Sequence, residues 1–460
     1  MLAHSPPLPL YIDYLNPTPD PPLIAEVDGI ILALKQRDRV RRIRLQMPVP
    51  IIQKVIRVIE EEYPVLEYLI MFPSTTLKSM ALVLSETFQA PHLRHLMLRG
   101  FGFPIGSRLL TTAVGIVALS LFLDHPSAYI QPHTLLQLFS FMPQLETFRV
   151  DYNVPALNGQ VASRPMHTPI TTHVTFPNLR WFEFLGPTAY MEAVVYGITA
   201  PRLEKLHIQL MLQYSMSVPG LLQFMNTTEN LRFDDATFAF CRNHVSAKVY
   251  LRERPDIVAL SVTVFGWVLD VQVSCVAQIF NSFSQRLSEV EYLTLDYEDS
   301  REYNEVEFDR ASWRRTEWRN LLGSFGNVKA LRVDEELVEV VSLCLQVDEG
   351  EPSLELLPEL KKLTYSATDD TYGPFKSFID TRKQAGRPVT LICLTPWSRT
   401  VLSRSSSQGS SESSSVVTSS SSEAGSSEAE SDEAGSDEKG SDEAGNDEAG
   451  NSEAGSDLDT

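Results

Sequence analysis

Few residues of this chain have the types and spacing of a catalytic centre. The Gly-rich turn GFGFPIG at 100–106 follows a predicted strand, as the phosphate-binding turn of a dinucleotide site does. Its third glycine comes one residue late, however, and Pro104 stands where the next helix should offer amide donors to phosphate. His92 and His95 form an H-x-x-H pair with no third ligand beside them. We therefore expect a repeat turn and no metal centre.

The other candidate groups favour a protein without catalytic chemistry. Asp234 and Asp235 are adjacent carboxylates, but such residues serve far more often as surface charges than as an acid–base pair. The four cysteines are widely spaced and include no C-x-x-C pair, which predicts reduced, mostly buried thiols. The chain contains no G-x-S-x-G, P-loop or H-E-x-x-H motif. We expect a non-enzymatic protein that needs no cofactor.

A short phrase recurs along the chain and would position any functional side chain. It is clearest in FPNLRWFEF (176–184) and APRLEKLHI (200–208), where apolar residues occupy the first, fourth and sixth places of a six-residue frame. The segment PTAYMEAVVYGIT between the two phrases begins with Pro187, as many helices do. The frame recurs about every 29 residues on average, at the long end of the leucine-rich-repeat range. Its first residues are Val40, Leu66, Leu93, Ile116, Leu145, Leu179, Leu203, Thr228, Ile257, Val290, Val328 and Leu360.

This order of strand, helix and next strand predicts an α/β fold with parallel strands. We expect an irregular leucine-rich-repeat solenoid, with parallel strands on the concave face and helices on the convex face, because stacked repeats cover the apolar side of each helix. Further helices are predicted at 50–63, 77–88, 134–141 and 375–384 and from about residue 317, and a closing strand at 388–394. The expected domains are a cap and lead-in at 1–38, about twelve repeats at 39–395, and a tail at 396–460.

The charge of the chain is concentrated in that tail. The net charge is −20, and the residues from 403 onward contain fifteen acidic and two basic side chains. Serine runs and pentads such as SDEAG leave too little apolar surface to fold, so we expect a disordered acidic tail. The rest of the chain is nearly balanced in charge, which argues against a broad nucleic-acid surface.

The chain shows no targeting or membrane-spanning signal. The N-terminal MLAHSPPLPLYIDYL lacks a basic start, and the longest apolar run, 113–123, is too short to cross a bilayer. We expect an intracellular monomer, cytoplasmic or nuclear, that does not bind membranes.

A repeat fold of this kind offers a surface rather than a pocket. Residues that alternate with the buried frame positions would line the concave face, and mixed charge with Trp and Tyr is typical of protein recognition. A solvated face without a partner is the alternative. The long segment Asp296 to Trp318 is either a loop between repeats or a partner-binding insertion. The predicted partner-binding residues are Arg99, Arg149, Asp151, Trp181, Glu183, Lys205, His207, Arg232, Asp234, Tyr292, Asp296 and Arg332.

Several longer phrases resemble the leucine-rich-repeat region of the basidiomycete F-box protein family. Among them are TTAVGIVALSLFLDHPSAYIQPHTLLQLFSFMPQLETF, MHTPITTHVTFPNLRWFEFLGPTAYMEA, VPGLLQFMNTTENLRF and RTEWRNLLGSFGNVKALRVDEELVE, and the resemblance covers most of residues 1 to about 395. It implies the substrate-binding part of a ubiquitin-ligase receptor, with a protein target on the concave face.

The chain departs from this family pattern before PPLPLYIDY, where members usually carry an F-box. No helical F-box motif is found there, so no residue can be assigned to a ligase adaptor. Either the chain is a piece of a longer receptor, or it is an F-box-less relative that binds targets without delivering them. The layout of repeats followed by an acidic run also resembles nuclear acidic leucine-rich phosphoproteins, which implies a basic partner such as a histone on the tail.

Overall fold

A computed structural model describes residues 8–15, 24–74, 81–102, 107–125, 128–152, 172–211, 218–228, 230–231, 233–251, 254–266, 268–298, 315–346, 356–366 and 373–394. The chain divides into two compact units, residues 1–409 and 410–460, and every described residue belongs to the first. The predictions for the tail, and for most of the segment from 296 to 318, lie outside the described residues.

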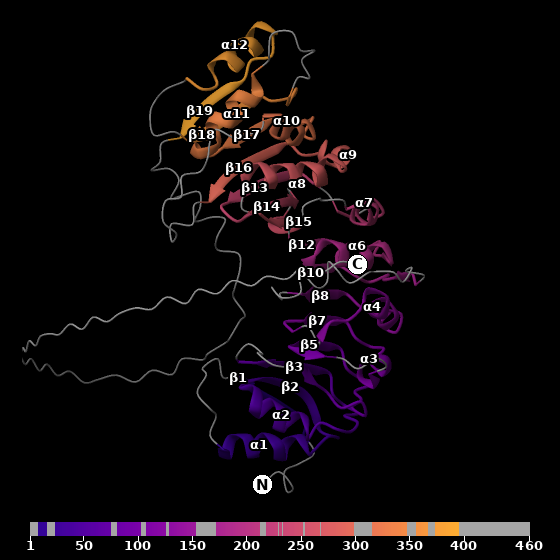
Figure 1. Cartoon of the computed structure of the whole chain (residues 1–460). Coiled ribbons are helices and arrows are strands. Elements are labelled where there is room, and N and C mark those ends of the chain that lie inside the picture. The colour runs from indigo at the N-terminus through magenta and orange to yellow at the C-terminus, as the bar shows by residue number, and fades with distance from the viewer. Residues whose placement is uncertain are drawn as a thin grey trace, which may run out of the picture. The chain divides into compact units, whose positions relative to one another are not determined.

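Fifteen strands of the first unit form one sheet (Figure 1), in the order β1-β2-β3-β5-β7-β8-β10-β12-β15-β14-β13-β16-β17-β18-β19. They are β1 (Leu10–Leu15), β2 (Val40–Met47), β3 (Tyr68–Pro73), β5 (His95–Arg99), β7 (Ala118–Phe122), β8 (Thr147–Asp151), β10 (Trp181–Pro187), β12 (Lys205–Met211), β13 (Asp235–Cys241), β14 (His244–Leu251), β15 (Arg254–Phe265), β16 (Tyr292–Glu298), β17 (Ala330–Val333), β18 (Lys362–Ser366) and β19 (Thr390–Leu394). Two small sheets pair β4 (Leu82–Val83) with β6 (Phe101–Gly102) and β9 (Val174–Thr175) with β11 (Ile198–Thr199).

Helices connect most of these strands. They are α1 (Ile24–Leu34), α2 (Val49–Ile56), α3 (Arg108–Thr112), α4 (Pro132–Phe139), α6 (Thr188–Tyr196), α7 (Pro219–Asn226), α8 (Leu269–Asn281), α9 (Ser284–Leu287), α10 (Arg315–Gly323), the 3₁₀ turn η4 (Glu335–Leu337), α11 (Val338–Leu345) and α12 (Lys376–Gln384). Several follow a proline that fixes the first helical φ, as in α4 and α7.

The predicted α/β class and the mostly parallel sheet are confirmed. All cross-strand pairs of the large sheet are parallel except β13 with β14 and β14 with β15. Segment 235–265 has a period-two apolar pattern, and only the two residues Arg242 and Asn243 separate β13 from β14. A connection this short can join only antiparallel strands, because a parallel crossover needs a dozen or more residues.

The six-residue frame marks buried positions. Leu179, Phe182 and Phe184 are all 0% exposed, and the corresponding residues of the other clean phrases are equally buried. At Thr228 the frame is wrong about the strand: the side chain is buried, but its hydroxyl donates to the Phe224 carbonyl, and the strand starts only at residue 235.

The helices pack on one side of the sheet and on one another. α4 contacts α6, α6 contacts α7, and α8 contacts α10, while α6 also packs on β10 (Figure 1). The predicted helix at 77–88 is wrong in its described part, which forms β4 and a turn around Thr87 that is held by a bond to the Glu60 carbonyl. The predicted helix at 50–63 is found but ends at Ile56, seven residues early, and the other predicted helices are found within a few residues of their expected ends.

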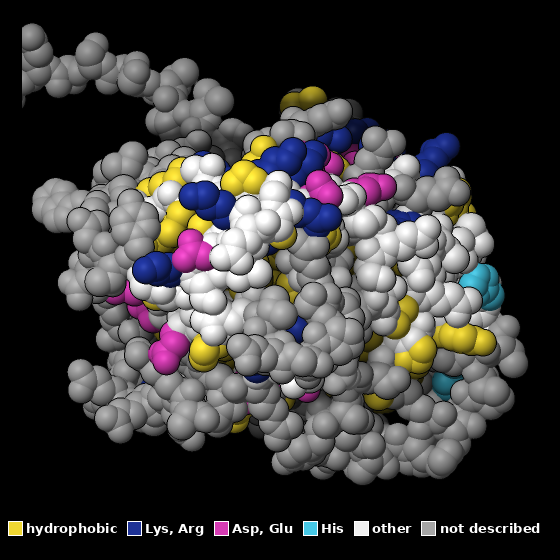
Figure 2. Space-filling model, turned by 90° about the horizontal axis from the view of Figure 1, so that it is seen from above, with side chains coloured by type: hydrophobic (Ala, Val, Ile, Leu, Met, Phe, Trp, Pro, Cys, Tyr) yellow, Lys and Arg dark blue, Asp and Glu magenta, His cyan; other side chains and the backbone are white. Residues whose placement is uncertain are grey.

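The core is continuous from β1 to β19 and contains the thiols. Cys241, Cys275 and Cys344 are buried and Cys393 is half-buried; none forms a disulfide, as the spacing predicted. Seen from the α12 end, Lys and Arg side chains are interspersed with Asp and Glu (Figure 2). No helix in the described part of the chain is long and apolar enough to cross a membrane.

Candidate functional site on the open face of the sheet

The side chains that alternate with the buried frame residues form what we call the open face of the sheet. On β12, for example, Leu206 and Ile208 are buried while Lys205 and His207 are only half-buried. Cross-strand register aligns one such residue from each strand into a middle row across all fifteen strands. The middle row is Asp13, Arg44, Ile70, Met97, Ser120, Arg149, Glu183, His207, Ser261, Lys248, Thr237, Thr294, Arg332, Thr364 and Ile392.

Three predicted residues meet at the centre of this row. Arg149 Nη2 lies 3.3 Å from Glu183 Oε1, and His207 Nδ1 lies 3.7 Å from the same oxygen. Glu183 is only 8% exposed, although alternation predicts an exposed position, because its two neighbours cover it. The Arg149 guanidinium also lies 4.7 Å from the centroid of the Phe122 ring. Opposite charges on adjacent strands thus hold a buried carboxylate in the sheet.

His207 is held as the neutral base. The Gln209 amide donates to Nε2 of His207 over 3.1 Å, an arrangement that places the ring proton on Nδ1. Burial lowers the pKa of His207; the nearby Glu183 raises it, and Arg149 and Lys248 lower it further. The imidazole therefore extends the polar row beside Glu183 rather than supplying a charge at neutral pH.

Asp151, at the end of β8, titrates closer to neutrality than an ordinary carboxyl. Burial and the charge of Asp124 raise the pKa of Asp151 to about 6, although Arg149 and Arg99 oppose the shift. Arg99 is more closely engaged with Asp124, since Nε lies 2.5 Å from Oδ2. The open face therefore carries one carboxyl whose charge depends on pH near the physiological range.

A first row runs parallel to the middle row, nearer the starts of the strands. On strands β1 to β12 it consists of Tyr11, Arg42, Tyr68, His95, Ala118, Thr147, Trp181 and Lys205. It resumes on β13 with Asp235 and continues with Tyr292, Ala330, Lys362 and Thr390 on β16 to β19.

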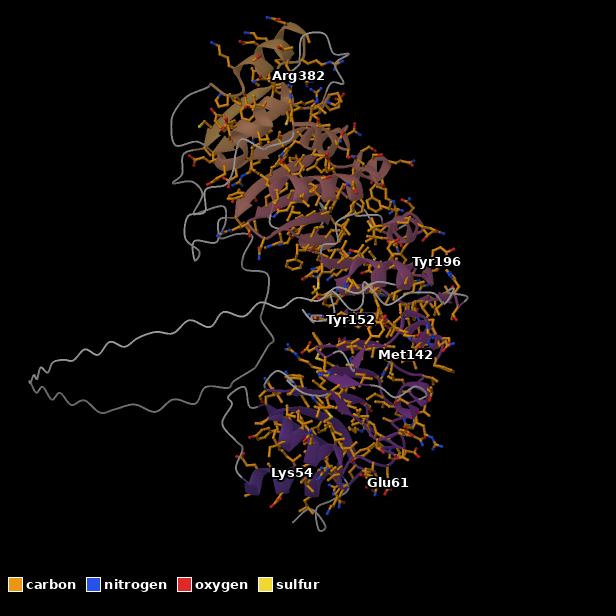
Figure 3. All side chains as sticks on the ribbon, viewed as in Figure 1. Lys54, Glu61, Met142, Tyr152, Tyr196 and Arg382 are labelled. Atoms are coloured by element: carbon orange, nitrogen blue, oxygen red, sulfur yellow. The ribbon has the colours of Figure 1, made fainter. Side chains whose placement is uncertain are left out.

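Three aromatic side chains of the first row are exposed. Trp181 is 41% exposed, with Lys205 Nζ 5.8 Å from its ring centroid, and Tyr292 and Tyr11 are 43% and 62% exposed. Tyr196 of α6, by contrast, is an exposed aromatic residue on the helix side of the sheet (Figure 3). Exposed Trp and Tyr beside cations are the side chains that most often anchor protein partners.

The structure separates the predicted residues into two groups. Arg99, Arg149, Asp151 and the predicted residues of β10 and β12 lie within the run β5-β7-β8-β10-β12, but the three strands β15, β14 and β13 intervene before β16. The group on the far side is Tyr292, Asp296 and Arg332.

The six-residue frame that begins at Thr228 predicted the wrong position for Asp234. Asp234 precedes β13, and Asp235 is the residue that pairs with Tyr292, because the strand starts later than the frame predicts. Arg232 lies outside the described residues.

Sequence reasoning missed Lys248 and Gln209. Lys248 lies in β14, which contains no six-residue frame, although alternation of Val245, Ala247 and Val249 could have shown a strand there. Gln209 follows His207 by two residues, so the same alternation places it on the open face.

The described residues offer little for catalysis or metal binding. Among them no group of three His, Cys, Asp or Glu side chains is arranged to hold a metal ion. His92 is exposed in a turn, and His95 stacks on Tyr68. Burial and the nearby Glu298 raise the pKa of the Cys241 thiol to about 12, so it stays protonated and unreactive at neutral pH. Phe101 and Gly102 of the Gly-rich turn form β6, and the φ of 71° at Gly100 explains the glycine there.

The chain was compared with protein-family models, with curated proteins and with solved structures, and none of the three comparisons found a match.

Proposed function

We propose that this chain is a non-enzymatic protein-recognition module: an irregular leucine-rich-repeat solenoid that binds a protein target on the open face, which would be the concave face of the solenoid. The main support for this proposal is a group of side chains on β8, β10 and β12. There an ordered network of Arg149, Glu183 and His207 lies beside the exposed ring of Trp181. Ordered polar groups around an exposed aromatic anchor resemble the make-up of protein interfaces.

The arrangement of polar groups supports recognition over catalysis. The carboxylate of Glu183 lies against Arg149 and His207, and Nε2 of His207 accepts a hydrogen bond from Gln209. A general acid or base must be able to reach a substrate proton, whereas a recognition surface benefits from side chains already held in place. The sequence resemblance to F-box receptors supports the same role. Co-purification of a ligase adaptor with the full chain would further support a role as a ubiquitin-ligase receptor.

Capture by paired variants tests the proposal. The immobilised full chain is incubated with cell extract, and bound proteins are quantified by mass spectrometry. Replacing Trp181 and Lys205 together by alanine should lower capture of specific proteins about tenfold or more, because a central aromatic anchor typically contributes 2 kcal/mol or more.

Tyr196→Ala is the matched control, because Tyr196 is exposed on the helix side. It should leave capture unchanged. If the double variant and the wild type capture the same proteins to the same extent, the open face is not the binding surface.

A further inference from the structure

The first row of the open face contains a ring stack that ends at a small residue. The rings of Tyr68 and His95 have centroids 4.2 Å apart and planes 3° apart. The two residues are cross-strand neighbours on β3 and β5, so one face of the imidazole covers Tyr68 and the other is turned toward β7. The neighbour of His95 on β7 is Ala118, whose side chain ends at Cβ. Ala118 therefore cannot continue the stack.

Trp181 faces the same region from the opposite side. Lys205 on β12 lies over one face of the indole, so the other face is turned toward β8, where Thr147 is the cross-strand neighbour. Thr147 and Ala118 are neighbours in turn, and both are only half-buried, so solvent reaches them. We call the space above Ala118 and Thr147, between the rings of His95 and Trp181, the Ala118 gap.

The dimensions of the Ala118 gap suit an aromatic side chain. His95 and Trp181 are three strands apart, and three spacings of about 4.8 Å give about 14 Å between the strands that carry them. A planar ring stacked on His95 would lie above Ala118 and leave room for backbone above Thr147. Further along the strands, Ser120 and Arg149 of the middle row bound the gap.

Two opposite charges lie at the mouth of the Ala118 gap. Arg94 and Glu146 immediately precede β5 and β8, and both are exposed. They act in opposite directions on His95, whose pKa is lowered mainly by burial: Arg94 lowers it further and Glu146 raises it. The adjacent Arg180 is paired with Glu204 at 3.4 Å, whereas in the described part of the chain Arg94 and Glu146 make no ion pair.

We propose that the Ala118 gap receives a Tyr or Trp side chain of the protein partner, stacked on His95 and flanked by one acidic and one basic residue. The acidic neighbour would face Arg94 and the basic neighbour Glu146. Stacking adds to the free energy of burying an aromatic ring, and unpaired charges at the mouth select complementary ones. This inference rests on the proposed recognition function, for which it names the chemistry of the partner's anchor.

p-Cresol, the analogue of a tyrosine side chain, tests the gap without the partner. It is titrated into the full chain carrying ¹³C-labelled histidine rings, with the His95 signal assigned by its loss in His95→Gln. The signal should shift upfield and saturate, with a dissociation constant on the order of millimolar for so small a ligand. Ala118→Leu fills the gap and should abolish the saturable shift.

Ala330→Leu is the matched control, since Ala330 lies in the first row on β17, far along the sheet order. It should leave the His95 titration unchanged. Ala118→Val adds less bulk on a strand that favours branched residues, and it should weaken the titration even if Ala118→Leu does not fold. A His95 signal that does not move, or that moves equally in the Ala118 variants, would overturn the proposal.

Capped tripeptides test the charges at the mouth. Asp-Trp-Lys should bind about two- to fivefold more tightly than Lys-Trp-Lys, the range of one exposed ion pair, and Arg94→Gln should remove the difference. Equal binding of the two peptides would refute the charge assignment.

The two proposals can fail separately. If p-cresol does not bind while the Trp181 and Lys205 variant still loses capture of protein, the Ala118 gap is not an aromatic-binding site. Protein docking on the open face would then remain supported. If p-cresol binds but the chain captures no protein, the recognition function is wrong, and the assignment of a partner's anchor falls with it.

Discussion

At the scale of single residues, the open face contains two carboxyls, Glu183 and Asp151, whose surroundings differ. Glu183 is buried but compensated by Arg149 on the next strand. Asp151 has no such contact: its Oδ1 is buried without a hydrogen-bond partner in the described part of the chain, and its pKa rises to about 6. We infer that Asp151 makes the stability of the folded chain depend on pH.

Asp151→Asn should stabilise the folded chain near pH 8 and have little effect near pH 4. Folding raises the pKa of Asp151 from 3.8 to about 6, so its contribution to stability is present below pH 3.8 and is lost as the pH rises through about 6. The gain near pH 8 should be about 1 kcal/mol, because solvent screening reduces the effect of a half-buried group. Urea unfolding at both pH values measures it, and an equal gain at both would contradict the assignment.

Alternation along the strands made most of the open-face residues predictable, but not their environments. Trp181, Lys205 and His207 follow from the six-residue frame alone. The burial of Glu183 and the pKa of Asp151 depend on which side chains lie on the adjacent strands. Cross-strand register decides which side chains become neighbours, and the sequence of one strand does not specify that register.

At the scale of elements, α7 is held at both ends by charged side chains of other helices. It has no side-chain cap of its own, and the Glu192 carboxylate of α6 accepts two backbone N–H groups of its first turn, at 2.6 and 2.9 Å. Arg286 of α9 donates to the carbonyls of Thr228 and Asn226 at the other end, at 2.7 and 3.2 Å. An anion at the start and a cation at the end both stabilise the helix dipole.

Glu192→Ala should destabilise the chain by about 1–2 kcal/mol, the cost of a lost helix cap with unsatisfied N–H groups. Glu192→Gln should cost less, because an amide oxygen can still accept one of the two bonds. Glu204→Ala is the matched control: it removes only an exposed ion pair and should cost under about 1 kcal/mol. The urea midpoints compare all three, and an unchanged midpoint in Glu192→Ala would show that the cap does not stabilise α7.

Element types were predictable where strand and helix periods were clean. The frame identified strands such as β10, β12 and β16 and the turns before them. It failed at β13 and β14, where hairpins with connections too short for a crossover interrupt the parallel order, whereas the frame at Ile257 lies in β15. In the sheet, the three strands β15, β14 and β13 therefore separate Tyr292, Asp296 and Arg332 from the predicted residues on β5 to β12.

At the scale of the whole molecule, a single sheet places residues from distant parts of the chain in common rows. Helices α4 and α6, for example, each pack on the next described helix along the chain. Contacts between consecutive elements of this kind require apolar residues at regular intervals, so they appear as a period in the sequence. The identity of a partner leaves no such period, because it depends on a few side chains such as Trp181 that the repeat does not require. The mostly parallel sheet was therefore predictable from the sequence, whereas the function stays a proposal.

Site-specific photo-crosslinking tests the central claim most directly. p-Benzoylphenylalanine replaces Trp181 on the open face in one variant and Tyr196 on the helix side in the other, at two exposed aromatic positions of the consecutive elements β10 and α6. After irradiation in cell extract, the account predicts defined protein adducts at position 181 that excess unlabelled wild-type chain competes away, and none at position 196. Adducts only at position 196, or equal adducts at both positions, would contradict protein docking on the open face.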